Sequence, residues 1–211
     1  AASDVYKRQG RLSPEAEEPI RRRAGACDAV LVGCGLGRGP GCDALVRRLL
    51  DLDRPLVLDA DGINALSGHI DLLDARRGRP TVLTPHEVEF ARIGGDLSRG
   101  DRERAAQDFA MAHGCVLVLK GHRTVTASPE GDVLVNTTGG SGLAKGGSGD
   151  VLTGVIASLM AQRADALRAA AVGVWLHGRA GDLAEQELTA YSVTPEDVVR
   201  KLPDAIREIL E

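Results

Sequence analysis

A glycine-rich loop followed by an aspartate carries the clearest chemistry in the sequence. Residues 146–150 read GGSGD and lead directly into an uncharged stretch, 151–162, that is typical of a buried helix. A helix N-terminus presents unpaired N–H groups and about half a positive charge, so it attracts anions. Glycine lets an anion approach the backbone closely. Gly146, Gly147 and Gly149 are therefore predicted to form a cradle for an anion such as a phosphoryl group.

Asp150 has two possible roles at the start of this helix. As an N-cap it would accept a hydrogen bond from a backbone N–H group in the first turn. As a base it would take a proton from a substrate hydroxyl while that oxygen attacks phosphorus. The residues alone leave both roles open. The loop is not a Walker A motif, because no Lys-Ser or Lys-Thr pair follows the last glycine.

The elements that must position this loop alternate along the chain. Continuously apolar runs predict strands, and segments with helical spacing follow each of them. The predicted strands are 28–33, 55–60, 81–85 and 115–121, and the predicted helices after them are 42–50, 64–75, 86–95 together with 102–114. A hairpin over 124–136 and helices at 149–162, 164–188 and 195–210 complete the chain. The pattern predicts one α/β domain with a parallel sheet covered on both faces.

Open parallel sheets bind ligands at the carboxyl ends of their strands. Four loops leave such ends here, at 32–39, 58–64, 83–90 and 119–124, and each carries glycine or polar residues. We expect them to meet the GGSGD loop on one rim of the sheet.

Several polar residues in these loops are ambiguous on their own. His86 reads as a helix-start residue, and Glu89 as either a water-mediated magnesium ligand or an acid favoured by the helix dipole. Asp59 and Asp61 could polarise a magnesium-bound water, but we interpret them as loop caps. His177 lies inside a predicted helix and is interpreted as a packing residue.

Composition excludes several classes of protein. The 211 residues carry a net charge of −4, which gives no basic surface for nucleic acid or a membrane. Aromatic residues, which single-strand binders need for stacking, make up only 2%. The four cysteines lack zinc-ligand spacing and are interpreted as small core residues in a reducing compartment. The chain shows no signal peptide and no membrane-spanning stretch.

Six segments in order resemble one family. They read VGCGLGRG, VLDADGINAL, TVLTPHEVEFARI, VLKGHRTVTASPEG, NTTGGSGLAKGGSGDVLTGVIASLMAQ and AVGVWLHGRAGDLA. The GGSGDVLTG core resembles the anion-hole motif of the ribokinase-like superfamily. The whole set, from about residue 28 to the C-terminus, resembles the NAD(P)H-hydrate dehydratases. The resemblance implies a ribokinase-like three-layer αβα sandwich with a mostly parallel central sheet.

The resemblance also implies an activity. These enzymes use ADP, or ATP in some relatives, with Mg²⁺ to dehydrate the S-form of NADHX or NADPHX. The products are NAD(P)H, AMP and phosphate. Phosphorylating the C6 hydroxyl of the hydrated ring makes it a good leaving group.

Site residues follow from the matched motifs. The resemblance makes Asp150 the catalytic base, which also contacts the substrate, and it assigns hydrate binding to Gly35 and His86. It assigns the transferring phosphoryl group to the N–H groups of Gly147, Ser148 and Gly149. The adenine nucleotide would contact Lys120, Gly121, His122, Arg123, Thr124 and Gly149.

Domain limits and partners are expected on the same basis. Residues 1–12 are expected to be an artefactual or disordered start, and residues 13–211 a partial dehydratase domain that lacks the family's first strands. Relatives imply a homo-oligomer, a tetramer, that works with an NAD(P)H-hydrate epimerase domain in the cytoplasm. Two alternatives remain open. One is a ribokinase-like kinase acting on hydroxymethylpyrimidine, hydroxyethylthiazole or pyridoxal. The other is an inactive nucleotide-binding fragment.

Overall fold

The computed structural model describes residues 7–8, 11–12 and 16–211. Near the start, β1 (Lys7–Arg8) and β2 (Arg11–Leu12) pair antiparallel. The expectation of an artefactual start at residues 1–12 falls largely outside the described residues.

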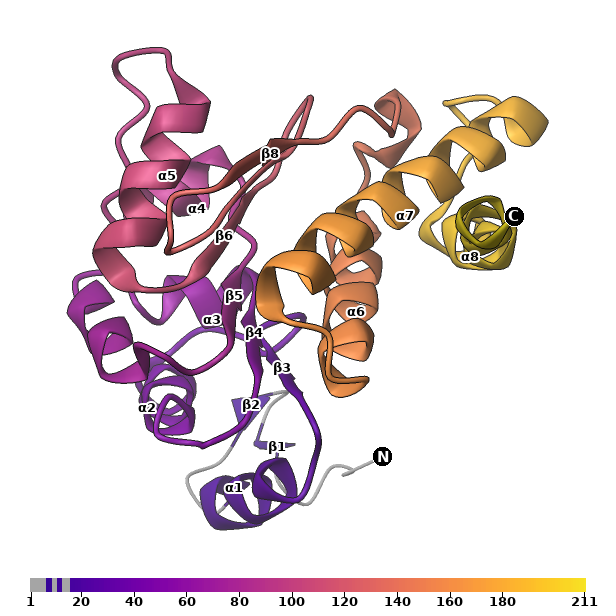
Figure 1. Ribbon diagram of the computed structural model, residues 1–211. Coiled ribbons are helices and arrows are strands. Elements are labelled where there is room, and N and C mark those ends of the chain that lie inside the picture. Colours follow the sequence, from indigo (N-terminus) through magenta and orange to yellow (C-terminus); the bar gives the residue numbers. More distant parts are fainter. Residues whose placement is uncertain (1–6, 9–10, 13–15) are drawn as a thin grey trace.

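A six-stranded sheet forms the centre of the fold (Figure 1). Its strands lie in chain order: β3 (Val30–Val32), β4 (Leu56–Leu58), β5 (Thr81–Leu83), β6 (Val116–Leu119), β7 (Val125–Ala127) and β8 (Val133–Val135). The first four run parallel, and β7 and β8 form an antiparallel hairpin on β6. The predicted parallel sheet and hairpin are confirmed.

Alternate side chains of the sheet enter two separate cores. Leu56 and Leu58 of β4 pack into one cluster, and Val57 between them packs into the other. A strand whose two faces are both buried needs apolar residues at every position, which is why these strands read as continuous apolar runs. The arrangement is a three-layer αβα sandwich.

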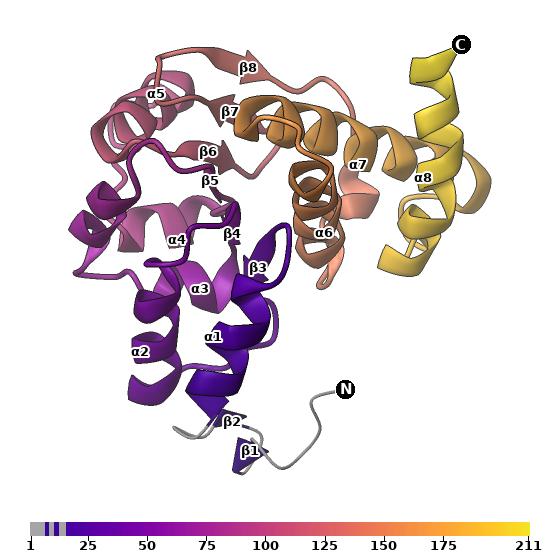
Figure 2. The same ribbon diagram turned by 60° about the horizontal axis from the view of Figure 1, so that its bottom comes forward.

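Helices cover each face of the sheet (Figures 1 and 2). The first core receives side chains from the helices on one face, and α6 (Ser148–Ala161) and α7 (Ala166–Leu188) pack into the second. The helices on the first face are α1 (Glu17–Gly25), α2 (Pro40–Leu49), α3 (Ala60–Asn64), the 3₁₀ helix η3 (Ile70–Arg76), α4 (Glu87–Arg92) and α5 (Arg102–His113).

One predicted helix is wrong in its extent. The segment 64–75 was expected to be continuous, but α3 ends at Asn64 and η3 begins only at Ile70. Between them Gly68 has φ +72°, a left-handed conformation that breaks a right-handed helix. A second short 3₁₀ helix, η4 (Ser141–Leu143), precedes the glycine loop.

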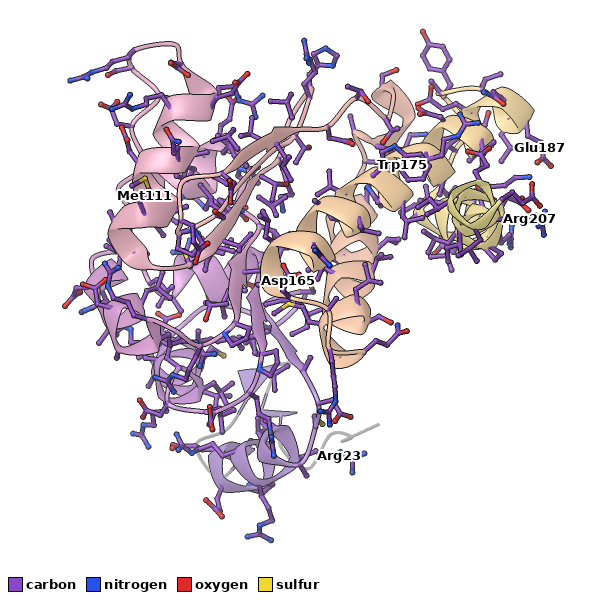
Figure 3. The ribbon with its side chains drawn as sticks, viewed as in Figure 1. Arg23, Met111, Asp165, Trp175, Glu187 and Arg207 are labelled. Atoms are coloured by element: carbon purple, nitrogen blue, oxygen red, sulfur yellow. The ribbon has the colours of Figure 1, made fainter. Side chains whose placement is uncertain are left out.

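The last two helices extend away from the sheet. In Figure 3, Asp165 marks the beginning of α7 and Glu187 lies in its last turn, so this helix runs from the sheet to α8 (Pro195–Leu210). A third, smaller apolar cluster joins α7 to α8. Thr194 caps α8, and Pro195 occupies the first helical position, where a missing N–H costs nothing. Within residues 16–211, even the longest helix lacks the apolar length needed to cross a membrane.

Candidate active site

The expected rim contains a cavity of about 840 Å³. Residues from the segments that follow β5, β6 and β8 line it together with the start of α6 and the middle of α7. Of the residues assigned from the sequence, it brings together His86, Lys120, Gly121, His122, Arg123, Thr124, Ser148 and Gly149. Gly35, Gly147 and Asp150 are not among its lining residues. Gly35 lies in the loop after β3, whereas Gly147 and Asp150 flank the lining residues Ser148 and Gly149 at the start of α6.

The glycine loop ends in a helix N-terminus as predicted. Gly147 is the N-cap of α6 and has φ +90°, a conformation that favours glycine. The Ser148 N–H donates to the Lys145 carbonyl at 3.2 Å. Across residues 16–211 no protein acceptor binds the N–H groups of Gly147, Gly149 and Asp150. Among the described residues the Gly146 N–H also lacks a protein acceptor, so within residues 146–150 every amide except that of Ser148 is open to an anion, whereas the resemblance assigned 147–149.

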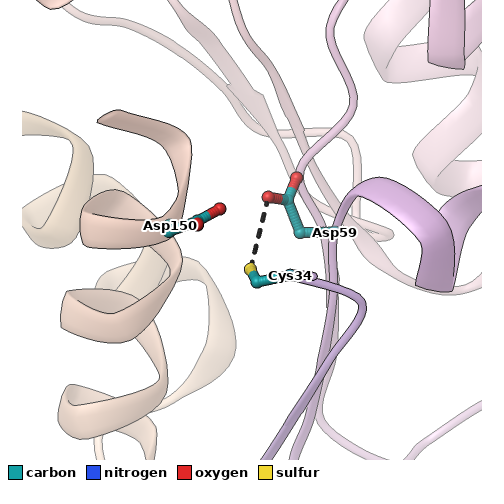
Figure 4. A group of neighbouring side chains, drawn as sticks. All are labelled: Cys34, Asp59 and Asp150. Atoms are coloured by element: carbon teal, nitrogen blue, oxygen red, sulfur yellow. Dashed lines mark hydrogen bonds between the residues drawn. The ribbon is translucent and has the colours of Figure 1, made fainter. Parts of the chain in front are cut away.

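Asp150 does not cap its helix. No side chain caps α6, and the Asp150 side chain, in the first turn of the helix, is exposed. Its carboxylate faces Asp59 and Cys34, and one polar atom from each of the three residues lies within 4.8 Å of the others (Figure 4). The N-cap role is excluded by this geometry, and the carboxylate is left available to act on a bound molecule.

Asp59 has a larger role than the preferred interpretation as a loop cap gave it. It lies immediately after β4, and only 2% of its surface is exposed. Its Oδ1 accepts hydrogen bonds from Lys120 Nζ at 2.7 Å and from Thr84 Oγ1 at 2.8 Å. A loop cap would bond nearby backbone N–H groups, so that interpretation is wrong for Asp59. The signal in the sequence was its position, directly at the carboxyl end of a wholly apolar strand.

Asp61 does behave as a loop cap. Its carboxylate accepts from the Gly37 N–H at 3.0 Å and from Asn64 Nδ2 at 3.5 Å. The bond from Gly37 ties the loop after β3 to the first turn of α3.

Lys120 joins the helix N-terminus to the acids of the site. Its ammonium group pairs with Asp59 and lies 3.9 Å from Glu89 Oε2. A Cβ atom on Gly149 would lie 3.4 Å from Lys120 Nζ and 3.7 Å from Asp59 Oδ2. The first turn of α6, a positive charge and a buried carboxylate thus meet at one point, where an anion could replace part of the Lys120–Asp59 pairing.

Cys34 reaches this point because two loops touch. Gly33 has φ +133°, and any side chain there would overlap the Asp59 carbonyl oxygen. The Cys34 thiol donates to Asp59 Oδ2 at 3.8 Å. Burial, and to a smaller extent the nearby Asp59 carboxylate, raises its pKa to about 11, so the thiol stays neutral. Cys42 and Cys115 are buried as expected, whereas Cys27 is exposed and Cys34 belongs to the site.

His86 and Glu89 form a reciprocal cap at the start of α4. His86 Nδ1 accepts from the N–H groups of Val88 and Glu89, and the Glu89 carboxylate accepts from the His86 N–H at 2.9 Å. The helix-start interpretation of His86 and the first-turn role of Glu89 are therefore supported. His86 also lines the cavity, and its Nε2 lies 3.4 Å from Glu89 Oε1.

His177 has more than a packing role. It is 8% exposed, lines the cavity, and places Nε2 3.2 Å from Ser148 Oγ. Burial, assisted by the charge of Lys120, lowers its pKa to about 4, while a hydrogen bond with the Ser148 backbone opposes the shift. The ring is consequently neutral near pH 7.

Lys145 fastens the glycine loop to the start of α8. Its ammonium donates to the carbonyl oxygens of Ala190, Tyr191 and Val193. A Cβ on Gly147 would lie 3.1 Å from Pro195 Cγ, so the loop and the first turn of α8 are in direct contact.

Comparison with known proteins identifies the family. The sequence model described as NAD(P)H-hydrate dehydratase matches residues 5–204. The chain belongs to this family. A Moorella thermoacetica protein named "Bifunctional NAD(P)H-hydrate repair enzyme Nnr" is 41% identical over 96% of this chain. A Neisseria meningitidis protein named "ADP-dependent (S)-NAD(P)H-hydrate dehydratase" is 42% identical over 75% of it. The chain spans 39% of the Moorella protein and 56% of the Neisseria protein.

Solved structures confirm the fold. The Bacillus subtilis ADP/ATP-dependent NAD(P)H-hydrate dehydratase, co-crystallised with ATP/Mg²⁺ and soaked with CoA, superposes with a TM-score of 0.74 at 32% identity. That match covers 89% of this chain and 71% of the Bacillus chain. A ribokinase-like superfamily protein from Enterococcus faecalis gives a TM-score of 0.78 at 27% identity, covering 93% and 69% of the two chains. The fold of this member of the NAD(P)H-hydrate dehydratase family is therefore ribokinase-like.

Proposed function

We propose that this chain catalyses the ADP-dependent dehydration of the S-form of NADHX or NADPHX, restoring NAD(P)H and releasing AMP and phosphate. One observation carries the proposal. Asp150 and the open first turn of α6 meet Lys120 and Asp59 beside a cavity that residues 120–124 line. This geometry suits transfer of a phosphoryl group to a hydroxyl followed by loss of phosphate, and it agrees with the family of the chain.

The proposed reaction has two steps, phosphoryl transfer and elimination of phosphate. The C6 hydroxyl oxygen of the hydrate attacks the terminal phosphorus of ADP, and the phosphorus–oxygen bond to AMP breaks, its electron pair staying on AMP. Asp150 accepts the hydroxyl proton. In the second step the C6–O bond breaks and phosphate leaves with the electron pair, while the C5 proton passes to water and the C5–H electron pair forms the C5=C6 double bond.

Each part of the site has a role in this scheme. Residues 120–124 hold the adenine nucleotide, and Lys120 neutralises its phosphates. The N–H groups of Gly147, Gly149 and Asp150 bind the migrating phosphoryl oxygens, since preorganised amides stabilise charge as it develops. Gly35 and the imidazole of His86, whose Nε2 lies 3.4 Å from Glu89 Oε1, contact the hydrated nicotinamide. The positions of His86, residues 120–124 and Gly149 around the cavity support their assignments.

The donor set also fits Mg²⁺. Magnesium prefers oxygen ligands and is usually held by one or two carboxylates with substrate phosphates. Asp59 and Asp150 supply such carboxylates, and the neutral Cys34 thiol is no ligand for it. When bound, Mg²⁺ would offset phosphate charge beside Lys120. Glu89 is less suited, because its carboxylate already caps α4.

The decisive test replaces the proposed base. Asp150→Asn is expected to lower the rate of NADH recovery from NADHX with ADP by about 10³-fold, while AMP affinity stays within about twofold. Recovery is followed at the absorbance of reduced nicotinamide, and the AMP released from ADP is measured in parallel. A second series replaces ADP with ATP, whose product is ADP. Asp204→Asn, on the exposed side of α8, serves as the matched control. Full activity of Asp150→Asn would remove the base assignment.

The same assay separates the rival functions. A ribokinase-like vitamin kinase would accumulate a phosphorylated substrate and restore no NADH. A noncatalytic nucleotide-binding unit would bind AMP without turnover by either chemistry. The hydroxyethylthiazole kinase of Pyrococcus horikoshii shares this fold at 18% identity, which bears on the fold alone.

Partners and setting are proposed alongside the activity. We propose that residues 13–211 form one dehydratase domain that assembles as a homotetramer and works with an NAD(P)H-hydrate epimerase domain. The word "bifunctional" in the name of the Moorella relative supports a second activity in that protein. A reducing, cytoplasmic setting suits the four cysteines, none of which is paired.

A further inference from the structure

Ser148 offers one group that the backbone scheme leaves unused. Its N–H already donates to the Lys145 carbonyl, so the amide is not available to an anion. Its hydroxyl is available, and Ser148 lines the cavity at the first residue of α6. The N–H groups on either side of it, from Gly147 and Gly149, have no acceptor within the described chain. The side chain therefore lies between two open amide donors.

His177 is the polar neighbour of this hydroxyl. Its Nε2 lies 3.2 Å from Ser148 Oγ, and both residues are buried. We propose that His177 donates its Nε2–H to Ser148 Oγ and so turns the serine hydroxyl hydrogen toward the terminal phosphoryl group of a bound nucleoside diphosphate. Ser148 is then a further catalytic residue, and His177 is a positioning residue. This inference rests on the function proposed above.

Packing fixes the imidazole at this distance. Gly178, the next residue of α7, lies so close to the chain that a Cβ atom there would sit 2.8 Å from the Thr138 backbone. Thr138 Oγ1 donates to the Trp175 carbonyl of the same helix at 3.0 Å. The segment that leads to the glycine loop therefore packs directly against α7. This packing keeps His177 of α7 close to Ser148.

The direction of the hydrogen bond decides whether the hydroxyl can act. A neutral imidazole carries one N–H, on either Nδ1 or Nε2. If Ser148 donated to Nε2, its only hydrogen would be consumed. With the hydrogen on Nε2, the serine oxygen accepts and its own hydrogen is free for a phosphoryl oxygen. We propose the second arrangement because it leaves the serine hydrogen free to point into the cavity that Ser148 lines. Burial keeps the ring neutral, so it orients the hydroxyl without adding a charge.

The test compares two nucleotides that differ by one phosphate. AMP has no terminal phosphoryl group beyond its α-phosphate, whereas ADP extends one to the glycine loop. Ser148→Ala is expected to lower the affinity for ADP about tenfold in calorimetric titration, because a hydrogen bond to a charged group is lost. The affinity for AMP is expected to change by less than about twofold. His177→Met, which keeps volume but has no donor, is expected to do the same. His177→Gln keeps an N–H donor and is expected to preserve the ADP preference. The double variant Ser148→Ala/His177→Met should lose no more than Ser148→Ala alone.

Each outcome decides between the alternatives. Equal weakening of ADP and AMP, or no weakening, would overturn the role of the Ser148 hydroxyl. Identical losses in His177→Gln and His177→Met would overturn the donor role of the imidazole. Melting temperatures of all variants separate a folding defect from a binding defect. Failure of the proposed function looks different, since the unaltered chain would then restore no NADH yet could still show the ADP preference. If the unaltered chain binds ADP no better than AMP, no phosphoryl contact exists and the inference is wrong.

Discussion

Acidification should destabilise this protein through His177 in a defined pH range. The unfolded histidine has an ordinary pKa near 6.5, and burial lowers the folded value to about 4. Between these values the unfolded chain binds a proton at this position and the folded chain does not. The free energy of unfolding therefore falls as the pH drops through this window and is unaffected by His177 well above it.

The magnitude follows from the two pKa values. Linkage gives a loss of about 2 kcal/mol between pH 7 and pH 5, and about 3 kcal/mol by pH 4. The side chain is nearly fully buried, so solvent screening removes little of this. Asp96 and Asp197 have lowered pKa values through hydrogen bonds to Ser98 and Thr194, and their contributions fade only below about pH 4.

The assay is urea unfolding at closely spaced pH values, followed by circular dichroism. His177→Gln provides the matched control because it cannot titrate. The difference in unfolding free energy between the two proteins should rise in favour of the variant by about 2 kcal/mol from pH 7 to pH 5. Parallel curves over this range would refute the reasoning and would mean that the imidazole is solvated or charged when folded.

Other substitutions test the packing and the buried charges. Gly178→Ala is expected to cost about 3 kcal/mol, because the added methyl overlaps Thr138, whereas Gly154→Ala, with open space around it, should stabilise α6 by about 1 kcal/mol; thermal melts of the pair check both signs. Arg76 is 1% exposed and donates to the carbonyls of residues 50, 52 and 54. Arg76→Met should cost about 4 kcal/mol and Arg76→Lys nearly as much, because neither replaces a planar set of donors; denaturant titration measures both, and a loss below about 1 kcal/mol would contradict this account.

The fold was largely readable from the sequence because burial on both sides of a parallel sheet leaves an unmistakable pattern. Strands such as β4 and β6 are apolar at every position, and the helices between them have regular spacing. The prediction of one continuous helix over 64–75 was wrong because the left-handed conformation of Gly68 interrupts it. The spacing of apolar residues does not indicate the φ angle of a glycine.

The site was only partly predictable. The glycine loop, Asp150 and residues 120–124 carry motifs, so their convergence was expected and the cavity brings most of them together. Asp59 and His177 were underestimated because their importance depends on partners that are distant in the chain, Lys120 and Ser148. Which amides of the loop are open to an anion was not readable either, since the Ser148 N–H bonds to Lys145 through local backbone geometry.

The contacts of Lys145 and Pro195 couple the glycine loop to α8. The body of α6 is anchored in the second core, whereas α8 is held by the small third cluster and by ion pairs from Glu208 and Lys201 to α7. An element with so little buried surface opens at a lower free energy than the rest of the fold. When α8 swings out, the loop at 145–147 loses its three carbonyl partners and its proline support together. The hydrogen-bonded N–H groups of Lys145 and Ser148 should therefore exchange with solvent at the rate at which α8 opens, faster than the amides deep within α6.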